Sequence, residues 1–428
     1  MDRTKTVISA KRAAAALLAL LLLFSLCACG SLGAAKAKAQ DLLENYEVQS
    51  VEVKVPDDIF RKAMLSFSVK LTETVAKDAE QGENVLLSPL SVLTAMTMTA
   101  NGAAGDTLKE MEKVLGGGLS VQDLNAYLAA YYHSLAKSET ITLKSANAIW
   151  INNDWEKEIK TSFLQTNVNY FNPAIRRAAF DSATLRDINE WVSMKTNKMI
   201  PKVLDDLDKD AIMVLLNALC FEAKWNDPFK STNVREATFT TEAGEKQNIE
   251  MMYTQETDYL YKEGLYSGFM KSYVGSRYAF VALLPQNGTS ISDFLGMLSA
   301  ETLAGLNETK SMEPIEIGLP RFSYDFSRDL IPYLKAMGLT SPFGPAADFS
   351  AMTGDPGEIS IGYVIHKTHI DVDSDGTKAA AVTAVIPTKA AAMPAPSLKV
   401  FLDRPFVYML WDTETGLPLF IGVVNSLK

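Results

Sequence analysis

Few side chains in this sequence have the types and spacing that catalysis or metal binding requires. The histidines are His133, His366 and His369, and the motifs G-x-S-x-G and H-E-x-x-H do not occur. His366 and His369 have a spacing compatible with a metal pair, but an offset of three residues on a strand points them to opposite faces. The sequence therefore predicts that the protein is not an enzyme and uses no cofactor.

A second candidate is the acidic stretch DVDSDG, residues 371–376. It resembles the first half of a calcium-binding EF-hand loop, with carboxylates at positions 1, 3 and 5 and glycine at position 6. Position 12 of such a loop is a bidentate glutamate, whereas here it is Val382, and the flanking residues are typical of strands rather than helices. We therefore expect neither a calcium site nor another metal site.

The same region has the composition of an exposed, cleavable segment. Residues 371–397 consist mainly of Ala, Thr and Val with scattered proline, and their only large apolar side chains are Ile386 and Met393. Such a segment cannot anchor a core, so we expect it to be exposed although strand-forming residues flank it on both sides. It is a cleavable segment within a domain, not a tail.

The beginning of this segment alternates as a strand would. Gly376 supplies backbone freedom just before this alternating stretch. One face after it carries only small side chains, which are Thr377, Ala379, Ala381 and Thr383, and Lys378 falls on the other face. A strand of this kind can enter the middle of a packed sheet, where a large or charged inward side chain would jam. The alternative is a flexible alanine-rich surface loop.

The elements around the segment mix helices with strands. Helical spacing or capping signals occur at residues 58–79, 88–102, 187–200 and 326–338. Strand-like runs occur at 210–225, 278–285, 314–326, 400–411 and 417–424, and the last two read as a hairpin through the turn DTETG. We find no internal repeat and no linker among these elements.

The N-terminus has the features of an export signal. Basic residues precede the apolar run AAAALLALLLLFS, which is too short for a comfortable membrane span of roughly 20 residues. The following sequence LCACG fits a bacterial lipobox, which predicts a signal peptide over residues 1–28 and lipid on Cys29. A plain signal peptide with an incidental cysteine is the alternative. Residues 29–54 are then a polar tether for a protein anchored to the outer face of a bacterial membrane.

The acidic composition limits which molecules the protein is expected to bind. The formal net charge of −10 argues against nucleic acid and against a basic patch for anionic lipid, so membrane contact is expected only through the anchor. If Cys27 is removed and Cys29 carries lipid, Cys220 is left without a disulfide partner, and packing must stabilise the fold. The remaining length would by default suggest two domains.

Several collinear motifs resemble the serpin family of serine protease inhibitors. They include NVLLSPLSVLTAMTMTANGAAGDTLKEMEKVL, LLNALCFEAKWNDPF, VIHKTHIDVDSDGTKAAAVTAV and DRPFVYMLWDTETGLPLFIGVVNSL. The resemblance covers residues 55–428, so it implies one α+β domain rather than two. That domain has three β-sheets, about nine helices and an exposed reactive-centre loop at about residues 374–397.

The resemblance also implies a function. A serpin is a suicide inhibitor: a serine protease attacks the reactive-centre loop, forms an acyl-enzyme and is distorted when the cut loop inserts into the main sheet. A non-inhibitory serpin acting as a cell-surface binding module is the alternative. We expect a monomer in either case. Ser374 and Lys378 depart from the family pattern, because acidic residues are usual at both positions. In addition, Pro387 lies in the part of the loop that must insert, where proline cannot donate a hydrogen bond to a neighbouring strand.

The family spacing assigns candidate site residues. The hinge is assigned to Gly376, Thr377, Ala379, Ala380, Ala381 and Thr383, and the shutter and breach to Ser88, Ser91, Asn189, Asn217, His366 and Trp225. Counting from Gly376 predicts the reactive bond between Ala390 and Ala391, which suits an elastase-like protease. Counting back from Arg404 gives a position near Pro394. Lys389 offers a bond to trypsin-like enzymes, subtilisin-like enzymes are possible targets, and Ala392 and Met393 are slipped alternatives for the elastase-like cut.

Overall fold

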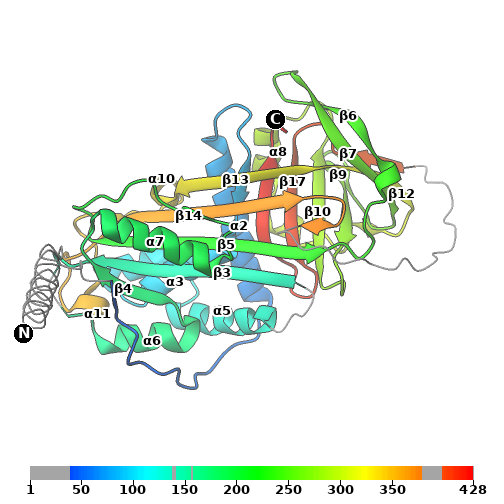
Figure 1. Ribbon diagram of the computed structural model, residues 1–428. Coiled ribbons are helices and arrows are strands. Elements are labelled where there is room, and N and C mark those ends of the chain that lie inside the picture. Colours follow the sequence, from blue (N-terminus) through cyan, green and yellow to red (C-terminus); the bar gives the residue numbers. More distant parts are fainter. Residues whose placement is uncertain (1–38, 137–140, 156–157, 378–397, 428) are drawn as a thin grey trace, which may run out of the picture. The chain divides into compact units, whose positions relative to one another are not determined.

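The longest strands form a mixed seven-stranded sheet, here called sheet A, in the computed structural model (Figure 1). The structure describes residues 39–136, 141–155, 158–377 and 398–427. In spatial order sheet A contains β1 (Gln40–Asp41), β4 (Ala174–Ala178), β3 (Ile141–Asn152), β5 (Met213–Lys224), β15 (Gly376–Thr377), β14 (Ile361–Val372) and β13 (Phe322–Asp329).

Both faces of sheet A are covered, which explains the continuous apolar character of β5. Val214 and Leu216 belong to a core beneath α7 (Ser182–Lys195), whereas Met213 and Leu215 belong to the main core on the opposite side. Because strand side chains alternate between faces, a strand with two buried faces needs apolar residues at nearly every position. Figure 1 shows α7 lying across the strands of this sheet.

Two further sheets complete the β structure of the described residues. Sheet B contains, in spatial order, β11 (Lys310–Ser311), β8 (Tyr259–Lys262), β9 (Tyr266–Ser272), β10 (Tyr278–Pro285), β17 (Phe406–Asp412), β18 (Leu417–Val424) and β2 (Val85–Leu87). Sheet C contains β16 (Leu398–Phe401), β12 (Ile315–Pro320), β7 (Lys246–Glu256) and β6 (Val234–Thr240). The predicted hairpin is β17 with β18, which pair antiparallel.

The helices are α2 (Asp58–Lys77), α3 (Pro89–Ala100), α4 (Gly105–Gly116), α5 (Val121–Ala136), α6 (Thr161–Phe171), α7, α8 (Ile291–Met297), α9 (Ala300–Ala304), α10 (Ile331–Ala336) and α11 (Ser350–Thr353). Helix α3 is buried along its whole length, and Ser88 caps its N-terminus next to Pro89. The α+β fold with three sheets and about nine helices is therefore confirmed for the described residues. None of the helices described here is long and apolar enough to cross a membrane.

One predicted element differs from the observed structure. Residues 326–338 were expected to be helical, but the strand β13 continues to Asp329, where it pairs with Ile365 of β14. The helix α10 begins only at Ile331, and Pro332 occupies its first turn, where a missing N–H costs little. Pairing with a long neighbouring strand therefore overrides the local helical pattern.

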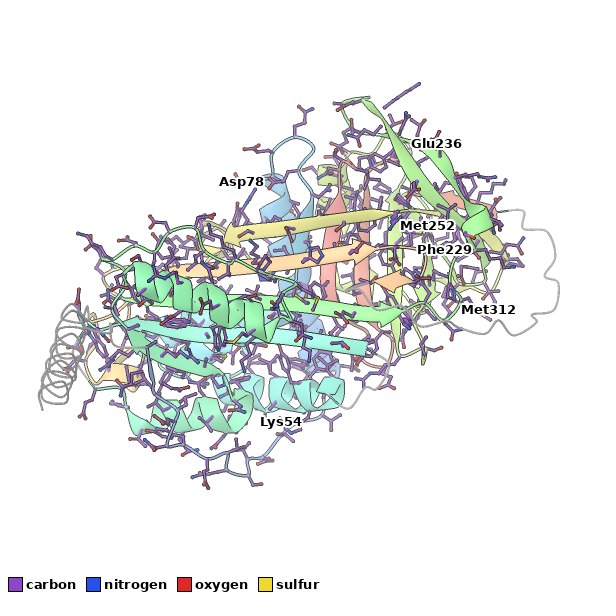
Figure 2. All side chains as sticks on the ribbon, in the orientation of Figure 1. Lys54, Asp78, Phe229, Glu236, Met252 and Met312 are labelled. Carbon is purple, nitrogen blue, oxygen red and sulfur yellow. The ribbon has the colours of Figure 1, made fainter. Side chains whose placement is uncertain are left out.

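Residues 39–54, expected to be part of a free tether, lie on the domain instead. Gln40 and Asp41 pair with β4 at the edge of sheet A, and Leu43 packs against the main core. Lys54, which is labelled in Figure 2, forms an ion pair with Asp123 of α5. The tether prediction is thus wrong for these residues, because their apolar side chains and backbone groups find partners on the sheet edge and on α5.

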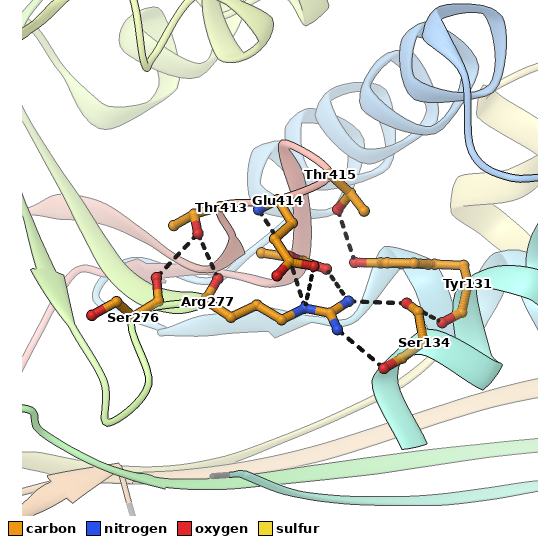
Figure 3. A network of polar contacts seen from close by, with 8 residues as sticks. Tyr131, Ser134, Ser276, Arg277, Thr413, Glu414 and Thr415 are labelled. Atoms are coloured by element: carbon orange, nitrogen blue, oxygen red, sulfur yellow. Dashed lines mark hydrogen bonds and ion pairs between the residues drawn. The ribbon is translucent and has the colours of Figure 1, made fainter. Parts of the chain in front are cut away.

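A polar network joins α5 to sheet B (Figure 3). Arg277, in the turn between β9 and β10, lies 3.0 Å from the buried carboxylate of Asp412 and 3.3 Å from Glu414. Its guanidinium also donates to the carbonyl oxygen of Ser134 at 3.1 Å and to the hydroxyl of Ser134 at 2.9 Å. Because Asp412 is fully buried, its charge requires this partner, and the network fixes the last turn of α5.

Candidate functional site

The central feature of sheet A is the boundary between β5 and β14. These parallel strands pair directly up to Leu219 and Thr368. Beyond this point β15 lies between them and runs antiparallel to both, with Thr377 paired to Ala223 of β5 and to Val372 of β14. The start of the predicted loop is therefore already the first piece of a central strand.

Thr377 is held in this position by Tyr273, the residue that follows β9. Its side chain is buried, and its hydroxyl lies 2.5 Å from the hydroxyl of Tyr273. The ring of Tyr273 stacks on Trp225, with 4.5 Å between ring centroids and 8° between planes. Burial raises the pKa of Tyr273, so its phenol stays protonated and the hydroxyl pair can share a hydrogen bond.

Gly376 is required for space rather than for backbone freedom. A Cβ at this position would lie 2.2 Å from the carbonyl oxygen of Ala223 and 2.9 Å from the Cα of Lys224, both in β5. Gly376 is not among the residues with positive φ. Gly376 was predicted from the sequence for its backbone freedom, but the close approach of two backbones is the physical reason for glycine here.

The turn before Gly376 is fastened to the breach residue Trp225. The carboxylate of Asp373 accepts hydrogen bonds from the backbone N–H groups of Asp375 at 2.8 Å and Gly376 at 3.1 Å. The indole N–H of Trp225 donates to the carbonyl oxygen of Asp373 at 2.9 Å, and its backbone N–H donates to Asp375. The calcium-like spacing of DVDSDG thus corresponds to an Asx turn that positions the hinge.

A buried lysine that was not predicted from the sequence lies against Trp225, with its Nζ 5.6 Å from the ring centroid. The Lys271 side chain is only 1% exposed, and its Nζ lies 2.6 Å from Glu256 and 2.8 Å from the carbonyl oxygen of Asp227. The same Nζ lies 4.8 Å from the ring centroid of Phe229, which is labelled in Figure 2. Burial raises the pKa of Glu256, and the Lys271 cation opposes this shift. A lysine within the apolar strand YSGFMKS was the available signal.

A polar cluster lies beneath the centre of sheet A, which the resemblance identified as the shutter. Asn217 donates to Ser91 at 2.5 Å and to Asn147 at 2.7 Å, and its Oδ1 lies 2.6 Å from Nδ1 of His366. The backbone N–H of Ser88 donates to Nε2 of His366 at 3.1 Å. Since Nε2 accepts, the proton of the neutral ring is on Nδ1 and is donated to Asn217.

The environment of His366 favours its neutral form. The side chain is completely buried, and burial lowers the pKa of His366 from its ordinary 6.5 to about 3. A proton on Nε2 would remove the acceptor of the Ser88 N–H. The cluster is therefore a set of mutually satisfied neutral groups that link α3, β5 and β14.

Asn189 does not belong to this cluster. It lies on α7, where its Oδ1 accepts from the backbone N–H groups of Val203 at 2.7 Å and Leu204 at 3.0 Å, so it anchors the chain that follows the helix. The position expected for it is taken by Asn147 of β3. Asn147 and Asn217 each interrupt a row of apolar residues that faces the main core, and this interruption could have identified both from the sequence.

Several predicted residues lie outside the described residues. They are Cys29, the hinge residues Ala379, Ala380, Ala381 and Thr383, and the reactive-bond residues Ala390 and Ala391. The structure does bring Gly376, Thr377 and Trp225 together at one end of the boundary between β5 and β14. It places Ser88, Ser91, Asn217 and His366 together farther along the same boundary.

Comparison with known proteins agrees with this arrangement. The family model described as "Serpin (serine protease inhibitor)" matches residues 62–427. Human neuroserpin is 29% identical over 85% of this chain and 90% of its own, and a serpin-like protein of Thermococcus kodakarensis is 30% identical over 86% of this chain and 85% of its own.

Solved structures show the same similarity. The native state of the thermophilic serpin tengpin has a TM-score of 0.84 and 38% identity, covering 91% of this chain and 100% of its own. Its latent state has a TM-score of 0.76 and 37% identity, covering 88% of this chain and 100% of its own. The present structure is thus more similar to the native state than to the latent state of that protein.

Proposed function

This chain belongs to the serpin family of serine protease inhibitors. We propose that it is a suicide inhibitor of serine proteases and that elastase-like enzymes are its preferred targets. The protease serine attacks the carbonyl carbon of Ala390, the bond to Ala391 breaks, and Ala391 leaves as a new amino terminus. Ala390 remains on the protease as an ester. The chain supplies no catalytic group. It traps the ester by moving the cut loop into sheet A before water can attack.

The register of β15 is the observation that carries this proposal. Gly376 pairs with Lys224 and Thr377 with Ala223, antiparallel to β5. If the strand continues in this register, Ala379 comes opposite Phe221, and Ala381 comes opposite Leu219. The small face of the hinge then lies over the apolar row of β5, where a larger side chain has no room.

The same register explains one departure from the family pattern. Continued past Thr377, it places Lys378 between Glu222 of β5 and Asp371 of β14. Both carboxylates are on the face of the sheet away from the main core and are partly exposed. A lysine is therefore the complementary residue for this chain, although acidic residues are usual at that position in the family.

Farther along, the register brings Thr383 to the shutter. It would lie between Asn217 and His366, whose side chains now bond to each other across the boundary. Insertion must break that bond and leave two buried polar groups without partners unless the new strand supplies them. The Thr383 hydroxyl can donate to one and accept from the other. The native state is thus closed by contacts that the inserted strand can replace.

The N-terminus supports a proposal on location. We infer that residues 1–28 are removed and that lipid on Cys29 anchors the inhibitor to the outer face of a bacterial membrane. Since residues from 39 onward dock on the domain, the tether is shorter than residues 29–54. Labelling cells with a fatty-acid analogue should mark the protein, and Cys29→Ser should remove the label.

The test of inhibition is a covalent complex on a denaturing gel after mixing with elastase, trypsin or subtilisin. The matched control is Ala379→Arg, which places a guanidinium on the inward face and should be cut without forming a complex. A C-terminal fragment that starts at Ala391 supports the predicted bond. A fragment that starts at Ala390, with complexes only for trypsin-like enzymes, would overturn it. Clean cutting of the parent by every protease would favour the alternative, a non-inhibitory binding module.

A further inference from the structure

The chain that follows β5 fastens the turn that precedes β15. Residues 226–229, here called the breach segment, form neither helix nor strand. The backbone N–H of Phe229 donates to the carbonyl oxygen of Ser374 in that turn at 2.9 Å, and the N–H of Asn226 donates to Ser272 of β9 at 3.0 Å. The position of the breach segment therefore determines where the first residues of the proposed reactive-centre loop lie.

The ammonium group of Lys271 holds the breach segment on both sides of Pro228. Its Nζ donates to the carbonyl oxygen of Asp227 at 2.8 Å and lies 4.8 Å from the ring centroid of Phe229. An ammonium group has three donors, and another of them is directed at Glu256, 2.6 Å away. Because Pro228 has no backbone N–H, a donor from a neighbouring strand fixes the chain at this point.

Through Lys271 the breach segment is joined to two sheets. Lys271 belongs to β9 of sheet B, and Glu256 is the last residue of β7 in sheet C. The Lys271 side chain is 1% exposed and the Glu256 side chain 20%. A buried ammonium group that loses its partners is strongly destabilising, so the position of Lys271 is fixed by the partners that surround it. The link to the carbonyl oxygen of Asp227 is correspondingly rigid.

Two aromatic residues at the ends of the breach segment connect Lys271 to the turn before β15. The indole N–H of Trp225 donates to the carbonyl oxygen of Asp373 at 2.9 Å, and the backbone N–H of Phe229 donates to that of Ser374. The Nζ of Lys271 lies near both rings, 5.6 Å from the centroid of Trp225 and 4.8 Å from that of Phe229. Lys271 thus contacts both residues that hold the turn and does not itself touch the turn within the described contacts.

We propose that Lys271 is a positioning residue of the inhibitory reaction, which holds the breach segment so that the turn before β15 stays seated between β5 and β14 and the cut loop inserts before water releases the protease. The effect on inhibition rests on the proposed function. The effect on the turn does not, because it can be measured on the intact protein without any protease.

The first test is Lys271→Met, which removes the ammonium group and keeps an unbranched side chain. We expect the backbone amides of Phe229, Asp375 and Gly376 to exchange hydrogen about fivefold faster or more, because local opening of the turn becomes easier. Mass spectrometry of the purified protein measures this exchange. More inhibitor molecules should also be consumed per elastase molecule trapped.

Lys310→Met is the matched control. Lys310 pairs with Asp258 at 2.9 Å, its side chain is 31% exposed, and no described contact joins it to residues 226–229. It therefore removes a partly buried lysine of sheet B without disturbing the breach segment. Exchange at the turn and consumption of inhibitor should both stay at the parent values. An equal effect of Lys310→Met and Lys271→Met would overturn the proposal.

A double variant separates positioning from charge balance. Lys271→Met with Glu256→Gln leaves no unpaired buried charge, so its melting temperature should return toward that of the parent, and it serves as the test even where Lys271→Met alone does not fold. The carbonyl oxygen of Asp227 still lacks its donor, so exchange at the turn should stay fast. If exchange also returns to the parent value, or if it stays fast while trapping is unaffected, Lys271 is not a positioning residue. If no protease forms a complex with the parent, the proposed inhibition fails, and the exchange result alone decides whether Lys271 holds the turn.

Discussion

The hydroxyl of Thr377 lies 2.5 Å from the hydroxyl of Tyr273, the residue after β9, and this contact holds Thr377 between β5 and β14 at the start of the proposed reactive-centre loop. This contact sets the register in which the rest of the loop would follow. It also means that the N-terminal end of the loop is already paired with β5 and β14 before insertion starts. The hinge is already seated, and the closed part of the boundary begins beyond it.

Removing the Tyr273 hydroxyl tests this anchor. Tyr273→Phe leaves the buried Thr377 hydroxyl without its partner and should destabilise the seated hinge by about 1–3 kcal/mol. We expect faster hydrogen exchange at the amides of β15, measured by mass spectrometry on the intact protein. Tyr261→Phe, which alters an exposed tyrosine of sheet B, is the control. Unchanged exchange in Tyr273→Phe would show that the contact does not hold the hinge.

Charge reversal tests the predicted position of Lys378. Lys378→Glu would place a carboxylate between Glu222 and Asp371, so we expect slower insertion and more molecules cut per protease trapped. Glu222→Lys combined with Lys378→Glu should recover a large part of the loss. The number of inhibitor molecules consumed per protease inactivated is the measurement. No loss in the single variant, or no recovery in the double variant, contradicts the register.

The Thr383 hydroxyl should matter only after cleavage. Thr383→Val keeps the shape but leaves Asn217 and His366 without a partner in the inserted form, which should cost about 1–3 kcal/mol there. The intact protein should be unaffected, because its shutter bonds do not include Thr383. Thr383→Ser restores the hydroxyl and should restore the stability. Denaturant unfolding of cut and intact protein compares the variants, and equal effects on both forms would refute the assignment.

His366 predicts how stability depends on pH. Its pKa is about 3 in the folded protein and near 6.5 when unfolded, so below pH 6.5 the unfolded chain binds a proton that the folded chain does not. Stability is therefore lost as the pH falls from 6.5 toward 3, by up to about 1.4 kcal/mol per pH unit from this group. Denaturant titrations at pH 7.5 and 5.0 measure the loss. His366→Gln should make this loss smaller, and an unchanged loss in His366→Gln would contradict the assignment.

The sequence predicted most of the fold because its signals were local or collinear. Ser88 with Pro89 marked the start of α3, and the turn DTETG marked the hairpin of β17 and β18. It could not show that residues 39–54 dock on the domain, since two residues of β1 carry no recognisable pattern. The end of β13 was predicted wrongly as helix. Asp329 is kept in the strand by its pairing with Ile365 of β14, which is 36 residues later in the sequence and cannot be recognised from the local pattern.

The site was predicted less completely than the fold. His366 and Asn217 were identified by resemblance and do lie in one cluster, but Asn147 was missed and Asn189 was assigned to it instead. Lys271 was also missed, because only tertiary packing shows that a lysine in an apolar strand is buried beneath Trp225. Polar residues that interrupt apolar rows are visible in a sequence. Their partners are not.

The central claim is that the cut loop becomes a strand between β5 and β14, and one melting experiment tests it most directly. The loop is cut near its C-terminal end by a protease that the protein does not trap, and the melting temperatures of cut and intact protein are compared. A cut ordinarily loosens a domain, since it removes a covalent constraint on the unfolded chain. Our account predicts the opposite, a clearly higher melting temperature after cutting that Ala379→Arg abolishes. A cut protein that melts at or below the temperature of the intact protein would contradict it.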